Sequence, residues 1–281
     1  MSLVRASIAL KDGARIPVLG QGTWYMGEHG GKRKQEIAAL RVGIELGMSL
    51  IDTAEMYGNG RAESLVGEAI RGVREDVFVV SKVLPSNASR KGVARACEAS
   101  LKRLNTDRID LYLLHWTSSH PLEGTLRGFE DLHAAGKIQR WGVSNFDRRE
   151  MEAMFAIAGG GVCAANQVLY NLMRRGIEHD LMTWCRERRV AVMAYSPIEQ
   201  GRVLDHPELR RIAQRHAATP AQIALAWLLR QGNIIAIPKA GTVEHVRENR
   251  AALDLTLTPQ DLHDLDRAFP PPRGPTPLEM L

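Results

Sequence analysis

The chain has 281 residues, of which 44% are hydrophobic and 25% are charged, and its net charge is +5. These values are ordinary for a soluble globular protein with a sizeable core, and no apolar run is long enough to span a membrane. Because basic and acidic residues are interspersed, no nucleic-acid-binding stripe is expected, and the mild positive excess fits either a phosphorylated small ligand or ordinary solubility.

The first predicted element is a β-hairpin over residues 7–18, with its turn at Asp12-Gly13. Short apolar runs that are typical of buried strands follow it along the chain. These predicted strands cover residues 18–24, 49–54, 78–83, 109–116, 139–145, 164–169, 190–197 and 234–239. The amphipathic stretches with helical spacing that lie between them include 33–47, 92–105 and 219–232. The glycines that stand where helix C-caps are expected are Gly47, Gly136 and Gly232.

Near-continuous apolar strands that alternate with helices indicate a parallel sheet covered by helices. Eight such units in a chain of this length predict an α/β fold of the (β/α)8 TIM barrel type, with a doubly wound sheet as the alternative. We expect the N-terminal β-hairpin to close the bottom of the barrel. No linker divides the sequence, so the prediction is a single domain over residues 1–281.

Seven polar residues stand at the C-terminal ends of predicted strands. They are Asp52, Lys82, His115, Asn145, Gln167, Tyr195 and Lys239. In a barrel these strand ends converge on one mouth, where such folds build their active sites. The sequence therefore predicts that these residues, although distant along the chain, surround one pocket.

The segment SLIDTAEMYGN, residues 49–59, ends a predicted strand on Asp52 and is followed at once by a phenol, Tyr57. Tyrosine is a weak acid, and a neighbouring cation such as Lys82 is expected to lower its pKa. Asp52 can supply the counter-charge for Lys82, and His115 can donate a hydrogen bond to a substrate oxygen. This set suits carbonyl reduction, in which the hydride must come from a cofactor.

Each of these residues also has a structural interpretation when it is taken alone. Asp52 can cap the following turn, and His115 and Lys82 can be ordinary residues of the barrel rim. Tyr57 and Tyr195 can be amphipathic packing residues. The ordered set of all of them favours the catalytic interpretation.

Several sequence stretches, taken in order, carry a resemblance to a known family. They are VLGQGTW, LIDTAEMYGN, VSKV, LLHW, WGVSNF, ANQVLYN, AYSP and IPKAGTVEHVREN. In this order and spacing they resemble the signatures of the aldo-keto reductases over nearly the whole chain. The residues of the first two stretches, VLGQGTW and LIDTAEMYGN, are most similar to those of a bacterial branch close to the methylglyoxal reductases. The resemblance implies a (β/α)8 barrel that acts as a monomer and binds NADPH across its mouth.

The resemblance also implies roles for individual residues. The catalytic tetrad would be Asp52, Tyr57, Lys82 and His115. The substrate pocket would be lined by Trp24, Tyr57, His115 and Trp116, although rim packing explains the two tryptophans equally well. The residues implied to bind NADPH are Gly22, Thr23, Trp24, Asp52, Ser144, Asn145, Gln167, Tyr195, Ser196, Pro197, Ile198, Gln200, Gly201, Ile237, Lys239, Ala240, Gly241, Thr242, His245, Glu248 and Asn249.

Within this implied cofactor site, each part of NADPH has its own contacts. Ser144, Asn145 and Gln167 would hold the nicotinamide amide, and Tyr195 would stack on the nicotinamide ring. Residues 196–201 would embrace the pyrophosphate. The 2′-phosphate and adenine would be surrounded by Lys239, Ala240, Gly241, Thr242, His245, Glu248 and Asn249.

Three positions depart from the family pattern. Ala240 offers no hydroxyl where the family often has serine. His245 stands where many relatives have arginine, which is a stronger phosphate ligand. Glu199 places a carboxylate near an anionic cofactor, which leaves the orientation of its loop as an open question.

The predicted function is NADPH-dependent reduction of aldehydes, with ketones and small dicarbonyls such as methylglyoxal as further candidates, and no metal is expected. The alternatives are a barrel that keeps its nucleotide as a redox sensor and an unrelated barrel isomerase or lyase. Cys97, Cys163 and Cys185 show no CxxC spacing and suit a reducing cytoplasm. Residues 1–13 lack the apolar core of a signal peptide. The proline-rich tail, 269–281, either folds back over the barrel mouth, as the resemblance suggests, or is disordered.

Overall fold

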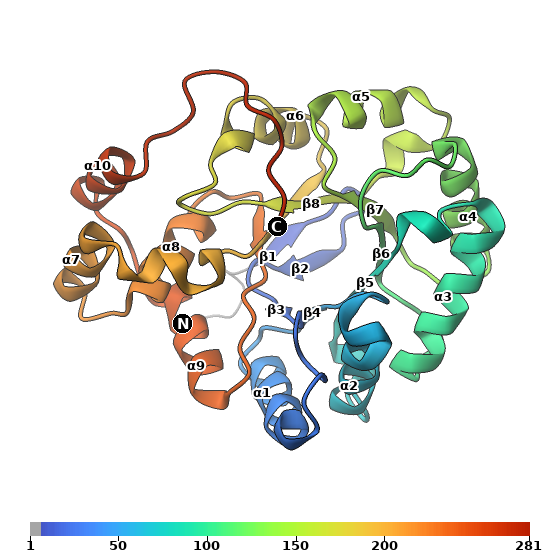
Figure 1. Cartoon of the computed structure of the whole chain (residues 1–281), viewed down its shortest axis with the longest axis horizontal. Coiled ribbons are helices and arrows are strands. Elements are labelled where there is room, and N and C mark those ends of the chain that lie inside the picture. The colour runs from blue at the N-terminus through green and yellow to red at the C-terminus, as the bar shows by residue number, and fades with distance from the viewer. Residues whose placement is uncertain (1–6) are drawn as a thin grey trace.

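The structure is a computed structural model that describes residues 7–281, and in these residues eight parallel strands form one sheet whose strand order follows the chain (Figure 1). The strands are β3 Gln21–Gly22, β4 Leu50–Asp52, β5 Phe78–Val83, β6 Leu111–Leu114, β7 Trp141–Ser144, β8 Ala165–Leu169, β9 Ala191–Tyr195 and β10 Ile234–Ala236. Parallel bridges from Leu19 to Ala236 and from Gly22 to Lys239 join the first strand region to the last. The sheet therefore closes, and the predicted (β/α)8 barrel is confirmed.

Helices surround the barrel on its outside (Figure 1). They are α1 Arg33–Glu45, α2 Arg61–Ala69, α3 Arg90–Leu104, α4 Leu122–Ala134, α5 Arg148–Ala156, α6 Leu181–Glu187, α7 Pro207–Arg215, α8 Pro220–Leu229, α9 Val243–Ala251 and α10 Pro259–Ala268. The three helices predicted from the sequence correspond to α1, α3 and α8. The starts of α3 and α8 follow from local capping: Ser89 accepts a hydrogen bond from Gly92 at the start of α3, and Thr219 forms a capping box with Gln222 at the start of α8.

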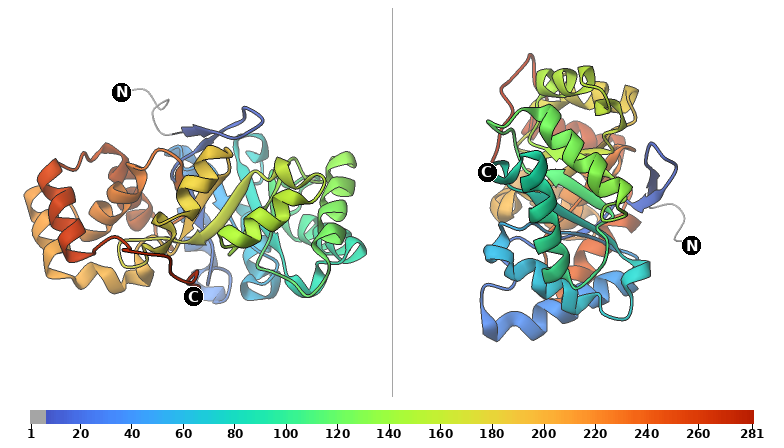
Figure 2. Two further views of the ribbon diagram at one scale, coloured as in Figure 1. Left: turned by 90° about the horizontal axis from the view of Figure 1, so that it is seen from above. Right: turned by 90° about the vertical axis from the view of Figure 1, so that its right-hand side faces the viewer.

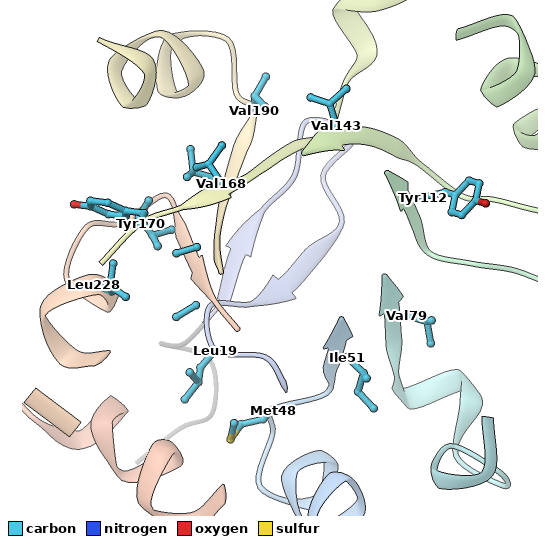
Figure 3. Packing of buried hydrophobic residues seen from close by; sticks show 14 of the residues in the cluster. Leu19, Met48, Ile51, Val79, Tyr112, Val143, Val168, Tyr170, Val190 and Leu228 are labelled. Atoms are coloured by element: carbon cyan, nitrogen blue, oxygen red, sulfur yellow. The ribbon is translucent and has the colours of Figure 1, made fainter. Parts of the chain in front are cut away.

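The hydrophobic core has two layers, because successive side chains of a strand point to opposite faces of the sheet. One layer fills the inside of the barrel and includes Leu50, Val80, Leu111, Leu113, Met193 and Ile235. The other layer lies between the strands and the helices, and Figure 3 shows part of it, including Ile51, Val79, Tyr112, Val143 and Val168. This alternation decides which side chains at the strand ends face the barrel axis.

The predicted N-terminal hairpin consists of β1 Ser7–Ala9 and β2 Arg15–Pro17, which pair antiparallel. Leu10 and Ile16 of the hairpin pack into the inner layer of the core, so the hairpin closes one end of the barrel as expected. Figure 2 shows the hairpin and the C-terminus on opposite sides of the barrel.

Residues 1–6, which belong to the stretch in which no signal peptide is expected, lie outside the described residues. Within residues 7–281, no helix combines the length and the apolar character that crossing a membrane requires. The three cysteines of the chain are free and buried.

Candidate active site

The predicted ring of polar residues lies at the C-terminal end of the barrel because it continues the inner face of the strands. Side chains two residues apart on a strand share a face. Six of the seven ring residues follow an inward-facing apolar residue at this spacing. The pairs are Leu50 and Asp52, Val80 and Lys82, Leu113 and His115, Ala165 and Gln167, Met193 and Tyr195, and Ile237 and Lys239.

Asn145 is the exception in this ring, because it follows the outward-facing Val143. Its backbone is left-handed, with a φ of 58°, a conformation that asparagine tolerates better than most residues. With this backbone the side chain of Asn145 reaches the inner side, where it accepts a hydrogen bond from the hydroxyl of Tyr195 over 3.0 Å. The strand ends thus converge as the sequence predicts, and one left-handed residue completes the ring.

A cavity of about 690 Å³ opens at this end of the barrel. The predicted site residues that line it are Gly22, Thr23, Trp24, Asp52, Tyr57, His115, Trp116, Ser144, Asn145, Gln167, Tyr195, Ser196, Pro197, Ile198, Gln200, Gly201, Ile237 and Lys239. Lys82 is fully buried and does not line the cavity itself, whereas its hydrogen-bond partners Asp52 and Tyr57 do. The structure therefore brings most of the predicted residues to one site.

At one wall of the cavity, Lys82 holds both Asp52 and Tyr57. Its ammonium group donates hydrogen bonds to Asp52 Oδ2 at 2.8 Å, to the Thr53 carbonyl at 2.8 Å and to Tyr57 Oη at 3.1 Å. Because an ammonium group has three N–H donors, all of them have partners here. Tyr57 accepts from Lys82, so its own hydroxyl hydrogen is free to point elsewhere, including into the cavity.

The pKa of Tyr57 is raised above its ordinary value, so the expected net lowering is wrong, although Lys82 does act in the lowering direction. Burial is the largest cause, and it outweighs the opposing charge of Lys82, while the charge of Asp52 raises the pKa further. Burial alone would lower the pKa of Lys82, but the charge of Asp52 and the contact with Tyr57 raise it above the ordinary value. The site therefore keeps the phenol protonated and the lysine positively charged around neutral pH.

His115 presents a neutral imidazole to the cavity. Burial and the nearby charge of Lys82 lower its pKa to about 3, so the ring is uncharged at neutral pH. The ring lies 5.8 Å from the ring of Tyr57 and 4.9 Å from that of Trp116, measured between centroids. Among the described residues His115 Nδ1 has no hydrogen-bond partner. A neutral imidazole still carries one N–H, which is what a donor to a substrate oxygen needs.

Amide and hydroxyl groups form the opposite part of the ring. Gln167 Nε2 donates to Asp52 Oδ1 over 2.7 Å, and the hydroxyl of Ser144 donates to the Gln167 carbonyl over 2.9 Å. Asn145 Nδ2 donates to the His115 carbonyl over 3.2 Å. These bonds connect the amides to the Asp52–Lys82 pair, so the carboxylate of Asp52 is held from two sides.

The predicted contacts to a 2′-phosphate and adenine divide into two groups. Lys239 is exposed and lies at the cavity wall. Of the others, Ala240, Gly241 and Thr242 precede α9, and His245, Glu248 and Asn249 lie within it. Thr242 is the N-cap of this helix and accepts a hydrogen bond from the backbone of His245. The residues that lie outside the cavity wall are Ala240, Gly241, Thr242, His245, Glu248 and Asn249.

Glu199 does not face the cavity, although Ile198 and Gln200 on either side of it do. Its carboxylate is completely buried and is paired with Arg174 and Arg202. The departure noted in the sequence therefore does not place a carboxylate at the cavity wall, because this side chain turns into the protein.

Four lining residues were not predicted, namely Tyr25, Met56, Met280 and Leu281. All four are exposed, between 38% and 56%, and they are apolar or aromatic at the mouth of the cavity. Tyr25 has a φ of 65° and stacks on Trp24 at 4.8 Å between ring centroids. Met280 and Leu281 show that the C-terminal tail folds back over the mouth. Tyr25 and Met56 could have been predicted as lining residues, because they are the sequence neighbours of Trp24 and Tyr57.

Comparison with known proteins shows which family and which solved structures this chain is similar to. The model of the aldo/keto reductase family matches residues 18–269. The chain is 52% identical to the methylglyoxal reductase YeaE of Escherichia coli over 95% of each chain. It superimposes with a TM-score of 0.96 on an aldo/keto reductase of Klebsiella pneumoniae in complex with NADP and acetate, at 49% identity over 98% of this chain and 99% of the other. A Klebsiella pneumoniae aldo-keto reductase in complex with NADPH gives a TM-score of 0.95 at 50% identity over the same shares of the two chains.

Proposed function

Because the chain belongs to the aldo/keto reductase family, we propose that this oxidoreductase uses NADPH to reduce aldehydes to alcohols, with Tyr57 as the general acid. The observation that carries the proposal is the pair of hydrogen bonds that Lys82 donates at the cavity, one to Asp52 and one to Tyr57. Small dicarbonyls, methylglyoxal first, are the leading substrates, and the similarity to a bacterial methylglyoxal reductase supports this choice. Ketones form a second group of candidates.

The residues present fit NADPH. Ser144, Asn145 and Gln167 offer the amides and hydroxyl that would hold the nicotinamide amide, and the ring of Tyr195 would stack on the nicotinamide. Lys239 offers a positive charge for a phosphate, and the N-terminus of α9 adds backbone N–H groups that favour an anion. When bound, NADPH supplies the hydride, a group that no side chain donates.

In the proposed mechanism the chain positions and protonates the carbonyl oxygen. The neutral imidazole of His115 donates a hydrogen bond that orients this oxygen. Tyr57 gives its hydroxyl proton to the oxygen as negative charge develops there. Lys82 stabilises the resulting phenolate, and Asp52 holds Lys82 in place. The apolar rim around Trp24 and Trp116 would exclude water from this exchange.

The test of the proposal is NADPH oxidation by the purified protein, followed by absorbance, with a panel of carbonyl compounds that includes methylglyoxal, benzaldehyde and a simple ketone. Turnover of at least one aldehyde is expected. Tight NADPH binding without turnover would instead support the nucleotide-sensor alternative. Absence of NADPH binding would contradict the proposal and leave an isomerase or lyase as the better hypothesis.

Replacing Tyr195 by alanine is expected to weaken NADPH binding by about 0.5–1.5 kcal/mol, the range of an aromatic stacking pair. The reason is the place of Tyr195 at the end of β9 on the cavity wall. Fluorescence titration with NADPH measures the change. Tyr195→Phe is the matched control, since it keeps the ring and removes only the hydroxyl that bonds Asn145. Unchanged affinity in the alanine variant would remove Tyr195 from the cofactor site.

His245→Arg is expected to strengthen NADPH binding by up to about 2 kcal/mol, the scale of a charge-assisted hydrogen bond. The side chain of His245 is exposed at the start of α9, near the proposed 2′-phosphate site. Arginine brings a permanent charge and a bidentate fork, so the preference for NADPH over NADH should rise in this variant. His245→Gln, an uncharged substitution at the same position, is the matched control and should show no such gain.

The measurement for this prediction is the ratio of NADPH to NADH affinities for the three proteins. An unchanged ratio in the arginine variant would place His245 away from the phosphate.

We also propose that the chain forms one domain and works as a monomer in the cytoplasm. All described helices belong to the shell and connections of one barrel, which supports a single domain. The proposed catalytic residues all come from one chain and meet at one site, so the proposed chemistry needs no residue of a second copy. The free, buried cysteines fit a reducing compartment. Light scattering during gel filtration tests the oligomeric state.

A further inference from the structure

The loop of residues 196–202, which follows β9, is held by the buried carboxylate of Glu199. This group accepts hydrogen bonds from Asn171 at 2.7 Å, from Arg202 at 2.8 Å and from Arg174 at 3.1 Å. Its side chain is 0% exposed. A carboxylate buried without partners would be costly, so these donors determine where the loop lies.

The backbone of the same loop adopts conformations that are unfavourable for the residue types present. Ser196, Glu199 and Gln200 have φ values of 46°, 50° and 54°. Residues other than glycine adopt such left-handed conformations at a cost, and they persist where surrounding contacts hold them. The contacts of Glu199 are among those that hold this loop against the cavity.

Arg174 differs from Arg202 because it also contacts the C-terminal tail. Its guanidinium pairs with Glu199 through Nε and Nη2, and with Glu279 through Nη1. Glu279 directly precedes Met280 and Leu281, which line the mouth of the cavity. Figure 1 shows the tail, in red, passing from α10 to the centre of the barrel. In the described part of the chain, the carboxylate that pairs with Arg202 is that of Glu199 alone.

We propose that Arg174 is a positioning residue that couples the loop 196–202 to the C-terminal tail, so that the cofactor side and the substrate side of the cavity become ordered together. The inference rests on the proposed NADPH-dependent reduction, because that proposal gives the loop to the pyrophosphate. A guanidinium is a rigid, planar group with five N–H donors. When the carboxylate of Glu199 holds Arg174 in one orientation, the N–H groups that Arg174 offers to Glu279 therefore have a fixed direction as well.

Arg174 itself has a fixed position, which such a link requires. It ends the tight turn Asn171–Arg174 after β8, where Asn171 Oδ1 accepts hydrogen bonds from the backbones of Met173 and Arg174. Asn171 Nδ2 also donates to the Ser196 carbonyl over 2.9 Å. The turn is therefore attached to the loop at two points, and Arg174 extends this attachment to the tail.

The experiment compares Arg174→Met with Arg202→Met and Glu279→Gln, by NADPH titration and by substrate KM at saturating NADPH. Both arginine variants should raise the Kd for NADPH by about two- to tenfold, the scale of the net contribution of a typical hydrogen bond. Arg174→Met and Glu279→Gln should raise KM by about two- to fivefold, the range of a partly exposed ion pair. Arg202→Met should leave KM unchanged, and Glu279→Gln should raise the Kd for NADPH by less than Arg174→Met does, because it removes only the coupling to the tail.

The double variant Arg174→Met/Glu279→Gln gives a further check, because its KM should equal that of Arg174→Met if the two side chains act as one unit. Equal KM values for Arg174→Met and Arg202→Met would overturn the inference. Arg174→Lys keeps the charge but not the planar guanidinium, and it replaces Arg174→Met if the methionine variant folds poorly. It should also raise KM. A wild-type KM in Arg174→Lys would contradict the proposed coupling of loop and tail.

Hydrogen exchange separates failure of this inference from failure of the proposed function, because it needs no turnover. In the ligand-free protein, Arg174→Met should speed amide exchange both in the loop 196–202 and in the tail, residues 276–281. Arg202→Met should speed amide exchange only in the loop 196–202. In the wild type, NADPH should slow exchange in the tail as well as in the loop, and this slowing of the tail should be lost in Arg174→Met. Tail exchange that is equal in the two ligand-free arginine variants contradicts the link, even if carbonyl reduction is established.

Discussion

Replacing Tyr57 by phenylalanine is expected to lower kcat for carbonyl reduction by about 10²–10⁴-fold, the usual worth of general acid catalysis. The substitution removes only the hydroxyl that accepts a hydrogen bond from Lys82 over 3.1 Å. The ring, its contact with His115 and the cavity wall remain. NADPH affinity should therefore change little, and the loss should appear in kcat measured by NADPH absorbance.

Tyr112→Phe is a matched control for this variant. It makes the same chemical change at a buried phenol whose hydroxyl has no hydrogen-bond partner among the described residues. Tyr112 belongs to the outer layer of the core, between the strands and the helices. Its activity should remain near that of the wild type. If Tyr57→Phe retained more than about a tenth of wild-type kcat with chemistry rate-limiting, Tyr57 could not be the proton donor.

The pH dependence of the reaction follows from the direction of the pKa shift. A phenol whose pKa is raised stays protonated to a higher pH than an ordinary tyrosine, and the protonated form is the one that donates. His115, with a pKa of about 3, stays neutral through the same range. We therefore expect kcat for reduction to show no loss from either group between pH 6 and pH 9. A fall in kcat between pH 6 and pH 9 that comes from loss of the Tyr57 proton would contradict a raised pKa for this phenol.

The position of the site could be predicted from the sequence because it depends on strand periodicity. Asp52, Lys82 and His115 each follow an inward-facing apolar residue by two positions, and this pattern is visible in the one-dimensional sequence. The pKa direction of Tyr57 could not be predicted in the same way. The sequence shows that a lysine is near, but the pKa depends on burial, which only the folded chain defines.

The part of the cavity rim that the C-terminal tail forms could be predicted only as one of two alternatives, for a different physical reason. Met280 and Leu281 belong to a tail without regular structure, so no periodicity shows which way they face. The pairing of Arg174 with Glu279 joins residues 105 positions apart through side chains alone. Glu199 could be recognised as unusual, yet its inward orientation depends on Arg174 and Arg202, whose partners no local pattern reveals.

Replacing Lys82 by methionine is expected to lower the free energy of unfolding by about 3–5 kcal/mol, the cost of breaking a buried ion pair on one side. Lys82 is fully buried, and the side chain of Asp52 is only 3% exposed. Methionine fills a similar volume but leaves the carboxylate of Asp52 with the hydrogen bond from Gln167 and without its cation. Denaturant unfolding followed by circular dichroism measures the change.

Two further variants decide whether this cost comes from charge. Lys34→Met makes the same substitution at an exposed position of α1 and should change stability by less than about 0.5 kcal/mol. The double variant Asp52→Asn/Lys82→Met removes the uncompensated charge and should recover most of the lost stability, because neither partner then remains charged in the interior. Activity should not recover with it, since no ammonium remains to stabilise the phenolate, and removing one such donor costs about 10²–10³-fold in kcat. A double variant that is as unstable as Lys82→Met would mean that packing, and not charge, holds this wall of the cavity. A double variant that regains activity would remove Lys82 from the proton transfer.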